Sequence, residues 1–385
     1  MSVGFAVILP TRHGLSCYPK ATFPHARQVR LNPDERFIPM PRMKTTAPSR
    51  AGLITLAAAI GAAATAVWVE SRARRAERER PPLGQFIDID GVRLHYVERG
   101  DGPPVVLLHG NTVSHADFEA SGLLDRLAKT HRVIAFDRPG YGYSDRPRDR
   151  LWTPPAQAAL FHAALAQLGI ERAVVVGHSM GTLTALAMAL DEPSRVASLV
   201  LLGGYYYPQL RVDALLTIPV ALPVLGDVMR YTVTALAGRL MLKGMVKGLF
   251  SPRATPANFF SLLSREMMLR PVQLRANAED AAFMMSAAKA LSPRYQELRM
   301  PVAIFAGADD MVVNFEAHST RLHEELAKSK LYVVAGTGHM VHYVAVEQII
   351  ALVSKPEDVT GINRSAMTMS NGTVHHPLPE AVQRL

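Results

Sequence analysis

Ser179 lies between two glycines in a G-x-S-x-G segment over 177–181. The apolar run 173–176 precedes this segment, and a run rich in Ala and Leu, 182–190, follows it. A buried strand, a serine flanked by glycines and a helix form the context in which the pattern predicts a nucleophile elbow. On such a sharp turn the hydroxyl stands clear of the backbone and the helix N-terminus faces the reacting atoms. The pattern therefore predicts that Ser179 is a nucleophile.

A serine nucleophile needs a general base, and histidine is the side chain whose pKa suits this role near neutral pH. His339 and His342 both follow the apolar run 331–334, which predicts a strand. Two glycines shortly before His339 allow its loop to turn back over a sheet, whereas His342 already lies in a segment of helical character. We therefore predict His339 as the base, with His342 as its competitor.

A carboxylate is expected beside the base, because it holds the tautomer of the imidazole and stabilises the imidazolium. Asp309 and Asp310 both follow a strand predicted over 302–306. A second position for the acid would be the segment after the strand predicted over 196–202. That segment begins with Gly203-Gly204-Tyr205 and offers no carboxylate. The acid is therefore expected at position 309 or 310.

Two backbone N–H groups that point to one place would stabilise an oxyanion. The Met180 amide is the first candidate, because it stands at the N-terminus of the predicted elbow helix, where N–H groups lack helical acceptors. The second candidate is the Asn111 amide, in the loop after a strand predicted over 104–108. The amides of Asn111 and Met180 are therefore the predicted oxyanion hole.

Short apolar runs alternate with helical segments from residue 85 onward. This alternation predicts the α/β class, with a mostly parallel central sheet and helices on both faces. Residues 205–297 interrupt the alternation with helical segments rich in Met and Leu, as a helical lid inserted between core strands would. The predicted hairpin lies over 86–97 with an Asp-Gly turn, further strands lie over 104–108, 132–136, 173–176, 196–202, 302–306 and 331–334, and helices lie over 123–129, 156–168 and 182–190.

Composition divides the 385 residues into seven segments. Residues 1–50 hold eight Lys or Arg against two acidic residues, so +6 of the net charge of +9 lies there. They show no hydrophobic periodicity, which predicts disorder. The predicted order is a disordered basic N-terminus (1–50), a transmembrane anchor (51–69), a linker (70–84), the first part of the α/β core (85–204), the helical lid (205–297), the second part of the core (298–354) and a flexible tail (355–385).

Residues 51–69 carry no charge, and nineteen residues of helix just span a bilayer core of about 30 Å. We predict an uncleaved N-terminal anchor in a bacterial inner membrane. A buried helix of a soluble protein and a cleaved signal peptide after a start at Met43 are the alternatives. Basic residues flank both ends of the segment, so the side of the membrane stays open.

Composition also excludes some classes of function. Cys17 is the only cysteine, so an intrachain disulfide and a zinc site of cysteine ligands are excluded. Beyond residue 50 the chain has no stripe of Arg and Lys interleaved with aromatic residues, which argues against a nucleic-acid partner.

The chain from about residue 85 to 353 resembles the α/β-hydrolase fold superfamily, and within it the lid-bearing, esterase- or lipase-like serine hydrolases. The resemblance implies the chain order nucleophile, acid, base, and its Gly-x-x-Asp pattern selects Asp310 over Asp309. It implies no cofactor and no metal. The segments that carry it are His109-Gly110, the glycine-rich loop 137–144, the elbow 177–181, the segment 307–310 and Gly338-His339.

The resemblance implies hydrolysis of a carboxylic ester through an acyl-enzyme. The apolar segments 215–225 and 228–250, the second of which carries Met229, Met241 and Met245, suggest an apolar acyl group, because Met side chains adapt to irregular apolar ligands. They would equally pack a lid onto the core. A carbon–carbon bond hydrolase of the meta-cleavage type, a cofactor-free perhydrolase and a catalytically silent binding module are the alternatives. The expected partners are a small ester and, through the anchor, a membrane, and the oligomeric state stays open.

Overall fold

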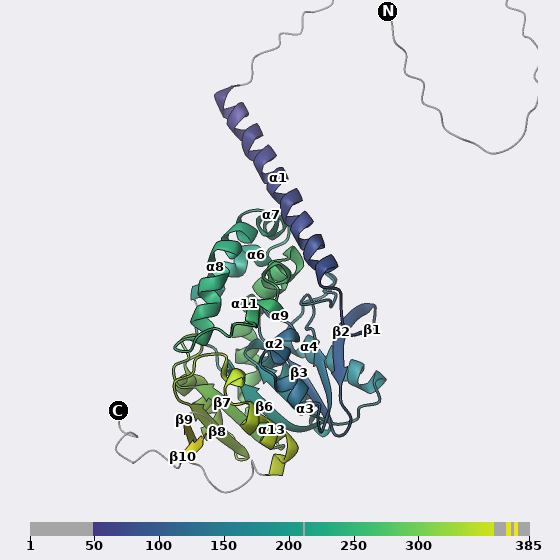
Figure 1. Ribbon diagram of the computed structural model, residues 1–385, viewed down its shortest axis with the longest axis vertical. Coiled ribbons are helices and arrows are strands. Elements are labelled where there is room, and N and C mark those ends of the chain that lie inside the picture. Colours follow the sequence, from purple (N-terminus) through teal and green to yellow (C-terminus); the bar gives the residue numbers. More distant parts are fainter. Residues whose placement is uncertain (1–48, 211, 358–366, 371–372, 376–385) are drawn as a thin grey trace, which may run out of the picture. The chain divides into compact units, whose positions relative to one another are not determined.

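The computed structural model of the protein describes residues 49–210, 212–357, 367–370 and 373–375. Cys17, Met43 and nearly all of the predicted basic N-terminus lie outside these residues, as does most of the predicted tail. From Ile54 onward the described residues form one unit around a central sheet (Figure 1).

The described residues form ten strands in one sheet, in the order β1-β2-β4-β3-β5-β6-β7-β8-β9-β10. All neighbouring pairs from β4 to β9 are parallel, whereas β1, β2 and β10 pair antiparallel with their neighbours. The strands are β1 (Gln85–Ile89), β2 (Val92–Arg99), β3 (Pro104–Leu108), β4 (Arg132–Phe136), β5 (Ala173–His178), β6 (Val196–Leu202), β7 (Val302–Gly307), β8 (Ser329–Val334), β9 (Met367–Ser370) and β10 (Thr373–His375).

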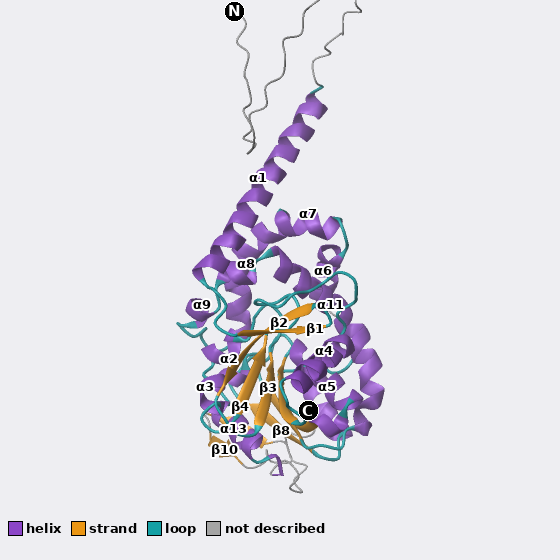
Figure 2. Cartoon of the chain, turned by 90° about the vertical axis from the view of Figure 1, so that its right-hand side faces the viewer, coloured by secondary structure: helices purple, strands orange, loops and turns teal. Residues whose placement is uncertain are grey.

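Helices cover both faces of the sheet, which Figures 1 and 2 show from two sides. Successive side chains of a strand point to opposite faces, so Val105 and Leu107 of β3 contribute to one buried cluster and Val106 and Leu108 to the other. The arrangement confirms the predicted α/β class. The helices on the first face are α2 (Ala116–Ala120), α3 (Leu123–Leu127) and α13 (Val346–Ser354), and those on the second face include α4 (Pro154–Gln167) and α5 (Met180–Asp191).

Six α-helices of the described residues lie between β6 and β7 in the chain, where the sequence predicts a lid. Residues 205–207, the predicted start of that lid, are buried tyrosines of the core. The Nδ1 atom of His318 accepts the Tyr206 and Tyr207 amides at 3.1 and 3.2 Å. The first five helices are called the cap helices below: α6 (Val212–Ala221), α7 (Leu225–Tyr231), α8 (Val233–Phe250), α9 (Phe259–Leu262) and α10 (Arg265–Met268); α11 (Pro271–Leu291) then returns to the core.

The N-terminal helix α1 runs without a break over Arg50–Glu79, so most of the predicted linker 70–84 is helical. The ion pair between Glu70 and Arg74, four residues apart, stabilises this extension, and residues 62–80 contain neither Gly nor Pro. Among the described residues, α1 is the one helix that is long and apolar enough to cross a membrane.

Two strands lie within the predicted flexible tail 355–385. β9 pairs in parallel with β8 and β10 pairs with β9, because the outer edge of β8 offers unpaired backbone groups. The remaining short elements are 3₁₀ helices over Pro193–Arg195, Ser292–Glu297 and Val341–Tyr343, a π-helical turn over Glu316–Thr320 and α12 (Arg321–Glu325).

Candidate active site

Ser179 lies at the turn between β5 and α5, with φ 51° and ψ −119°. A positive φ is strained for a residue with a Cβ atom, and such strain is typical of functional turns. The Ser179 amide donates to the Leu202 carbonyl oxygen at 2.9 Å. Gly181 allows α5 to start against β3, because a Cβ atom there would lie 2.2 Å from the Leu108 carbonyl oxygen. The predicted strand, turn and helix are therefore all present.

The structure brings the side chains of Ser179, His339 and Asp310 together. The His339 Nε2 atom lies 2.9 Å from the Ser179 Oγ atom, and the His339 Nδ1 atom lies 2.8 Å from the Asp310 Oδ2 atom. The three residues follow β5, β8 and β7 respectively. Because the carboxyl ends of parallel strands meet at one edge of a sheet, residues far apart in sequence converge there.

Asp310 is held as a carboxylate. Its Oδ1 atom accepts the amides of Val312 at 2.7 Å and Val313 at 3.0 Å. Burial raises the pKa of the Asp310 carboxyl, but His339 and the two amides lower it more, so the pKa lies below its ordinary value. Asp309, the other candidate, is exposed, which agrees with its exclusion as the acid.

His342, the competing base, belongs to a separate buried group. Its Nε2 atom lies 2.9 Å from the Asp117 Oδ2 atom, and the Tyr343 hydroxyl donates to the other oxygen of Asp117 at 2.8 Å. Burial and the neighbouring His342 and His339 hold the pKa of His178 well below its ordinary value, so His178 is neutral. Its Nε2–H donates to the His339 carbonyl oxygen at 3.3 Å. Through this hydrogen bond, the group supports the loop that carries His339.

The loop that carries Asn111 passes directly beside Ser179. A Cβ atom on Gly110 would lie 3.0 Å from the Cβ atom of Ser179. The Asn111 Oδ1 atom accepts an Arg138 N–H at 2.9 Å and the Tyr141 hydroxyl at 3.0 Å. The side chain of Asn111 is thus fixed, and Met180, the first residue of α5, directly follows Ser179.

Helix α11 holds the next residue of this loop. Thr112 has φ 71°, its amide donates to the Asn277 Oδ1 atom at 2.7 Å, and its carbonyl oxygen accepts the Gln273 Nε2–H at 2.7 Å. Asn277 and Gln273 were not predicted from the sequence, because neither residue belongs to a local motif. Their side chains fix a strained backbone next to the candidate oxyanion hole.

A second missed group joins the glycine-rich loop 137–144 to α11. The Asp280 carboxylate is buried and lies 2.6 Å from the Arg138 Nη1 atom and 2.9 Å from the Arg146 Nη2 atom. The Arg138 guanidinium also donates to the His109 carbonyl oxygen at 2.8 Å. Burial raises the pKa of Asp280, but the two arginines lower it more, so the pKa lies below its ordinary value. One buried carboxylate therefore pairs with two buried arginines, of which Arg146 has Glu279 as a second partner.

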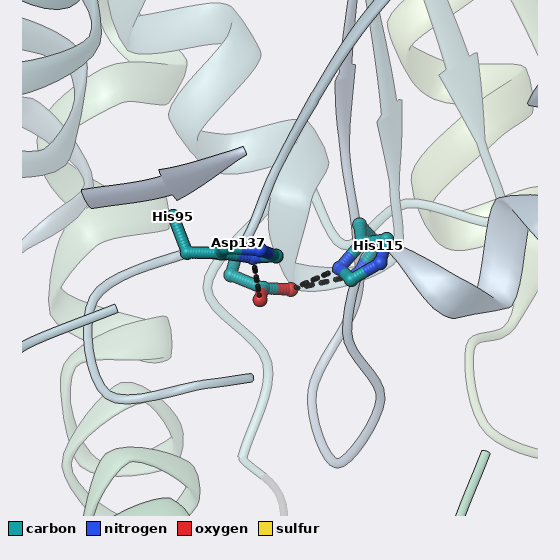
Figure 3. Close-up of side chains that lie close together, drawn as sticks. All are labelled: His95, His115 and Asp137. Carbon is teal, nitrogen blue, oxygen red and sulfur yellow. Dashed lines mark hydrogen bonds and ion pairs between the residues drawn. The ribbon is translucent and has the colours of Figure 1, made fainter. Parts of the chain in front are cut away.

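Asp137 holds two histidines on opposite sides (Figure 3). Its Oδ2 atom lies 2.8 Å from the His95 Nδ1 atom, and its Oδ1 atom lies 2.8 Å from the His115 Nδ1 atom. The backbone amides of Tyr143 and His115 donate to the same two oxygens at 3.0 and 2.9 Å. Two histidines and a carboxylate are a possible set of metal ligands. Here, four hydrogen bonds already occupy the carboxylate, so the contacts describe a hydrogen-bonded group.

This group predicts a pH-dependent contribution to stability. Burial lowers the pKa of His115, but the charge and hydrogen bond of Asp137 raise it more, so the pKa lies above its ordinary value. The stabilising charge of His115 is therefore complete below the unfolded pKa of about 6.5 and disappears as the pH rises through the folded pKa. We expect His115→Asn to cost most stability near pH 6 and progressively less above it.

Chemical denaturation of both chains at a series of pH values between 5.5 and 9 measures this effect. The asparagine can still donate a neutral hydrogen bond to Asp137, so the difference between the two chains isolates the charge. A difference in unfolding free energy that stays constant across the series would contradict the prediction.

Residues 103–346 match the family model described as the alpha/beta hydrolase fold. The chain belongs to the α/β hydrolase fold family. The 2-hydroxymuconate semialdehyde hydrolase of Pseudomonas putida is 35% identical to this α/β hydrolase over 129 residues, which are 34% of this chain and 46% of that protein. The match thus spans just under half the length of that relative.

Longer matches agree on the family. A hydrolase named YugF from Bacillus subtilis is 28% identical over 268 residues, which cover 68% of this chain and 92% of that protein. Among solved structures, an α/β hydrolase fold protein from Burkholderia ambifaria superposes with a TM-score of 0.61 and 27% identity, over 70% of this chain and 97% of the other.

Proposed function

We propose that this α/β hydrolase is a serine hydrolase that cleaves a carboxylic ester through an acyl-enzyme. The observation that carries the proposal is the unbroken chain of hydrogen bonds from Ser179 Oγ through His339 to Asp310, at 2.9 and 2.8 Å. A nucleophile, a base and an orienting acid in this geometry are the parts that acyl transfer needs.

The first half of the reaction forms the acyl-enzyme. As the Ser179 Oγ atom bonds to the ester carbonyl carbon, its proton passes to the His339 Nε2 atom. The carbonyl oxygen becomes an oxyanion that accepts the Asn111 and Met180 amides, where one such donor contributes about 3 kcal/mol. The tetrahedral intermediate then expels the alcohol, which takes the proton from His339.

The second half repeats these steps with water. His339 takes a proton from water, whose oxygen bonds to the acyl carbon, and the carboxylic acid leaves as Ser179 regains its proton. Asp310 stays ionised throughout, because its pKa lies below the ordinary value. Its charge stabilises the His339 imidazolium that forms in both halves.

The substrate we propose has an apolar acyl group, and the protein is anchored by α1. Residues 53, 54, 56, 60 and 67 of α1 are apolar and exposed, which agrees with a lipid environment for this part of the helix. The cap helices then act as a lid over the carboxyl edge of the sheet. An anchored enzyme meets apolar esters where they concentrate, in the membrane.

A carbon–carbon bond hydrolase is the second candidate. The observation that favours it is the 35% identity over 129 residues to a 2-hydroxymuconate semialdehyde hydrolase. The same serine, histidine and aspartate would serve that reaction, so the two candidates differ in substrate rather than in the site.

A fluorophosphonate probe tests the serine hydrolase proposal. We expect an adduct on Ser179 in the folded full-length protein and none in Ser179→Ala. A panel of p-nitrophenyl esters of rising chain length then tests the substrate, with kcat/KM expected to increase from acetate to medium-chain esters. Absence of the adduct would overturn the mechanism. Turnover of 2-hydroxymuconate semialdehyde without turnover of any ester would favour the second candidate.

A further inference from the structure

Exposed apolar side chains gather on the cap helices. Of the 25 large apolar side chains exposed among the described residues, thirteen lie between Leu210 and Leu262 and six lie on α1. Leu240 of α8 is 85% exposed and Val224, just before α7, is 76% exposed. A soluble protein rarely shows so many together without a partner. The set includes Leu216, Leu222, Val224, Leu225, Val228, Val233, Leu236, Leu240, Met241 and Met245.

The cap helices that carry these exposed side chains contact α1. The Arg239 guanidinium of α8 sits over the Trp68 ring of α1, 4.7 Å from the ring centroid. Glu266 of α10 joins the two elements, because its oxygens lie 3.1 Å from Arg72 and 2.6 Å from Arg239. Figures 1 and 2 both show α7 next to α1, and the contact between Arg239 and Trp68 joins α8 to it. The ion pairs hold this part of α1 in one place against the cap helices.

A further ion pair and three buried side chains also attach α1 to the rest of the protein. Arg270 pairs with Glu77 of α1 at 2.8 Å, and Val69, Ala73 and Ala76 of α1 are buried. The helix is thus bound to the protein from about residue 68 onward. An anchor that is bound in this way also fixes which face of the protein meets the membrane.

Trp68 marks the level of the membrane surface on α1. Tryptophan favours the interface between lipid and water, the apolar residues of α1 precede it, and four arginines follow between 72 and 78. Because Arg239 contacts Trp68, the N-terminal half of α8 lies at this same level.

The exposed stripe of α8 has the pattern of an interfacial helix. Val233, Leu236, Leu240, Lys243 and Lys247 recur at spacings of three and four residues, so they lie on one side of the helix. The first three are apolar, and the two lysines follow within about 10 Å along the axis. Lysines just beyond an apolar stripe reach lipid headgroups with their ammonium groups.

The charges of this region fit an anionic surface. Residues 216–250 contain one acidic residue, Asp227, against four basic ones. Asp227 is itself paired with Arg148 and Arg230. A second copy of this chain packed face to face on this surface would bring the same lysines against one another, which costs energy. An anionic lipid surface instead attracts each lysine.

We propose that the exposed face of α7 and α8 lies in the interface of the bilayer that holds α1, with Leu240 and Val228 among the lipid tails and Lys243 and Lys247 among anionic headgroups. The inference rests on the membrane anchor proposed above and adds a second contact, which orients the enzyme. The cap helices, rather than the far edge of the sheet, then face the lipid. An apolar ester can enter beneath the cap directly from the bilayer.

Site-directed fluorescence in the full-length chain tests this orientation. Cys17 is first replaced by serine, and single cysteines at Leu240, Val228, Ile60 or Leu151 are labelled with an environment-sensitive nitrobenzoxadiazole probe. Leu151 is the matched control, because it is 68% exposed and lies outside the cap helices. Each protein is reconstituted in vesicles of phosphatidylcholine and phosphatidylglycerol, with and without spin-labelled lipid.

The proposal expects blue-shifted emission at positions 240 and 228, quenched by spin-labelled lipid, and neither effect at 151. Quenching at 60 but solvent-like emission at 240 and 228 would overturn the cap contact and leave the anchor standing. Solvent-like emission at 60 would overturn the anchor itself. A blue shift at 240 and 228 that lipid does not quench would mean that protein covers this face, which also overturns the proposal.

A charge variant provides an independent test of the headgroup contact. We expect Lys243→Glu/Lys247→Glu to reduce quenching at position 228 in the anionic vesicles and to leave quenching at position 60 unchanged. The p-nitrophenyl acetate activity should stay at the unsubstituted level, because neither lysine belongs to the candidate active site. Unchanged quenching at 228 would contradict the assignment of the lysines to the headgroup layer.

Discussion

His339→Ala is expected to lower kcat/KM for an ester substrate by roughly 10⁴- to 10⁶-fold. The reason is that His339 connects the other two side chains: its Nε2 atom lies 2.9 Å from Ser179 Oγ and its Nδ1 atom lies 2.8 Å from Asp310. Without it, Ser179 has no acceptor for its proton and the leaving alcohol has no donor. The residual rate would come from binding and the oxyanion hole alone.

The matched control for this change is His342→Gln. His342 lies three residues further along and contacts Asp117, so glutamine can keep a hydrogen bond to that carboxylate. We expect kcat/KM to stay within about tenfold, which is about 1.4 kcal/mol of transition-state stabilisation. Steady-state kinetics of both variants, with circular dichroism to confirm folding, measure the effect. A larger loss for His342→Gln than for His339→Ala would reverse the assignment of the base.

The candidate site was predictable because its residues sit in local motifs. A motif of about five residues indicates each of them. Ser179 lies between glycines after one strand, and His339 follows glycines after another strand. The parallel sheet then brings the ends of β5, β7 and β8 together, so Ser179, Asp310 and His339 meet. The parallel core strands were also predictable from local sequence, because buried parallel strands are short continuous apolar runs.

The supporting groups were not predictable, because their partners are far apart in sequence. Asp280 and Asn277 lie in a helix that carries no motif, and nothing local indicates that they reach the loops of Arg138 and Thr112. The continuation of α1 from residue 70 to Glu79 was not predicted either, because some of its charges have partners that are distant in sequence. Residues 70–79 are strongly charged, which suggests a linker, yet several of these charges pair within the helix and with the cap helices.

Asp280→Asn is expected to lower the free energy of unfolding by about 3–5 kcal/mol, the usual effect of removing one partner from a buried ion pair. Arg138 and Arg146 have side chains that are fully buried, so neither can turn to water when the carboxylate is neutralised. Arg138 also holds Asn111 in place. We therefore expect kcat to fall as well, because the candidate oxyanion loop loses a rigid support.

The neighbouring residue on the same helix provides the control. Glu279 also contacts Arg146, at 2.7 Å, but its carboxylate is partly exposed and shared with Arg275. Glu279→Gln should cost about 1 kcal/mol or less, because Arg146 keeps its pair with Asp280 and the Glu279 side chain is itself partly exposed to water. Urea denaturation in detergent, followed by tryptophan fluorescence, compares the two variants. Equal losses would show that burial does not set the energy of this group, and an unchanged kcat in Asp280→Asn would contradict the role of Arg138 as a support of Asn111.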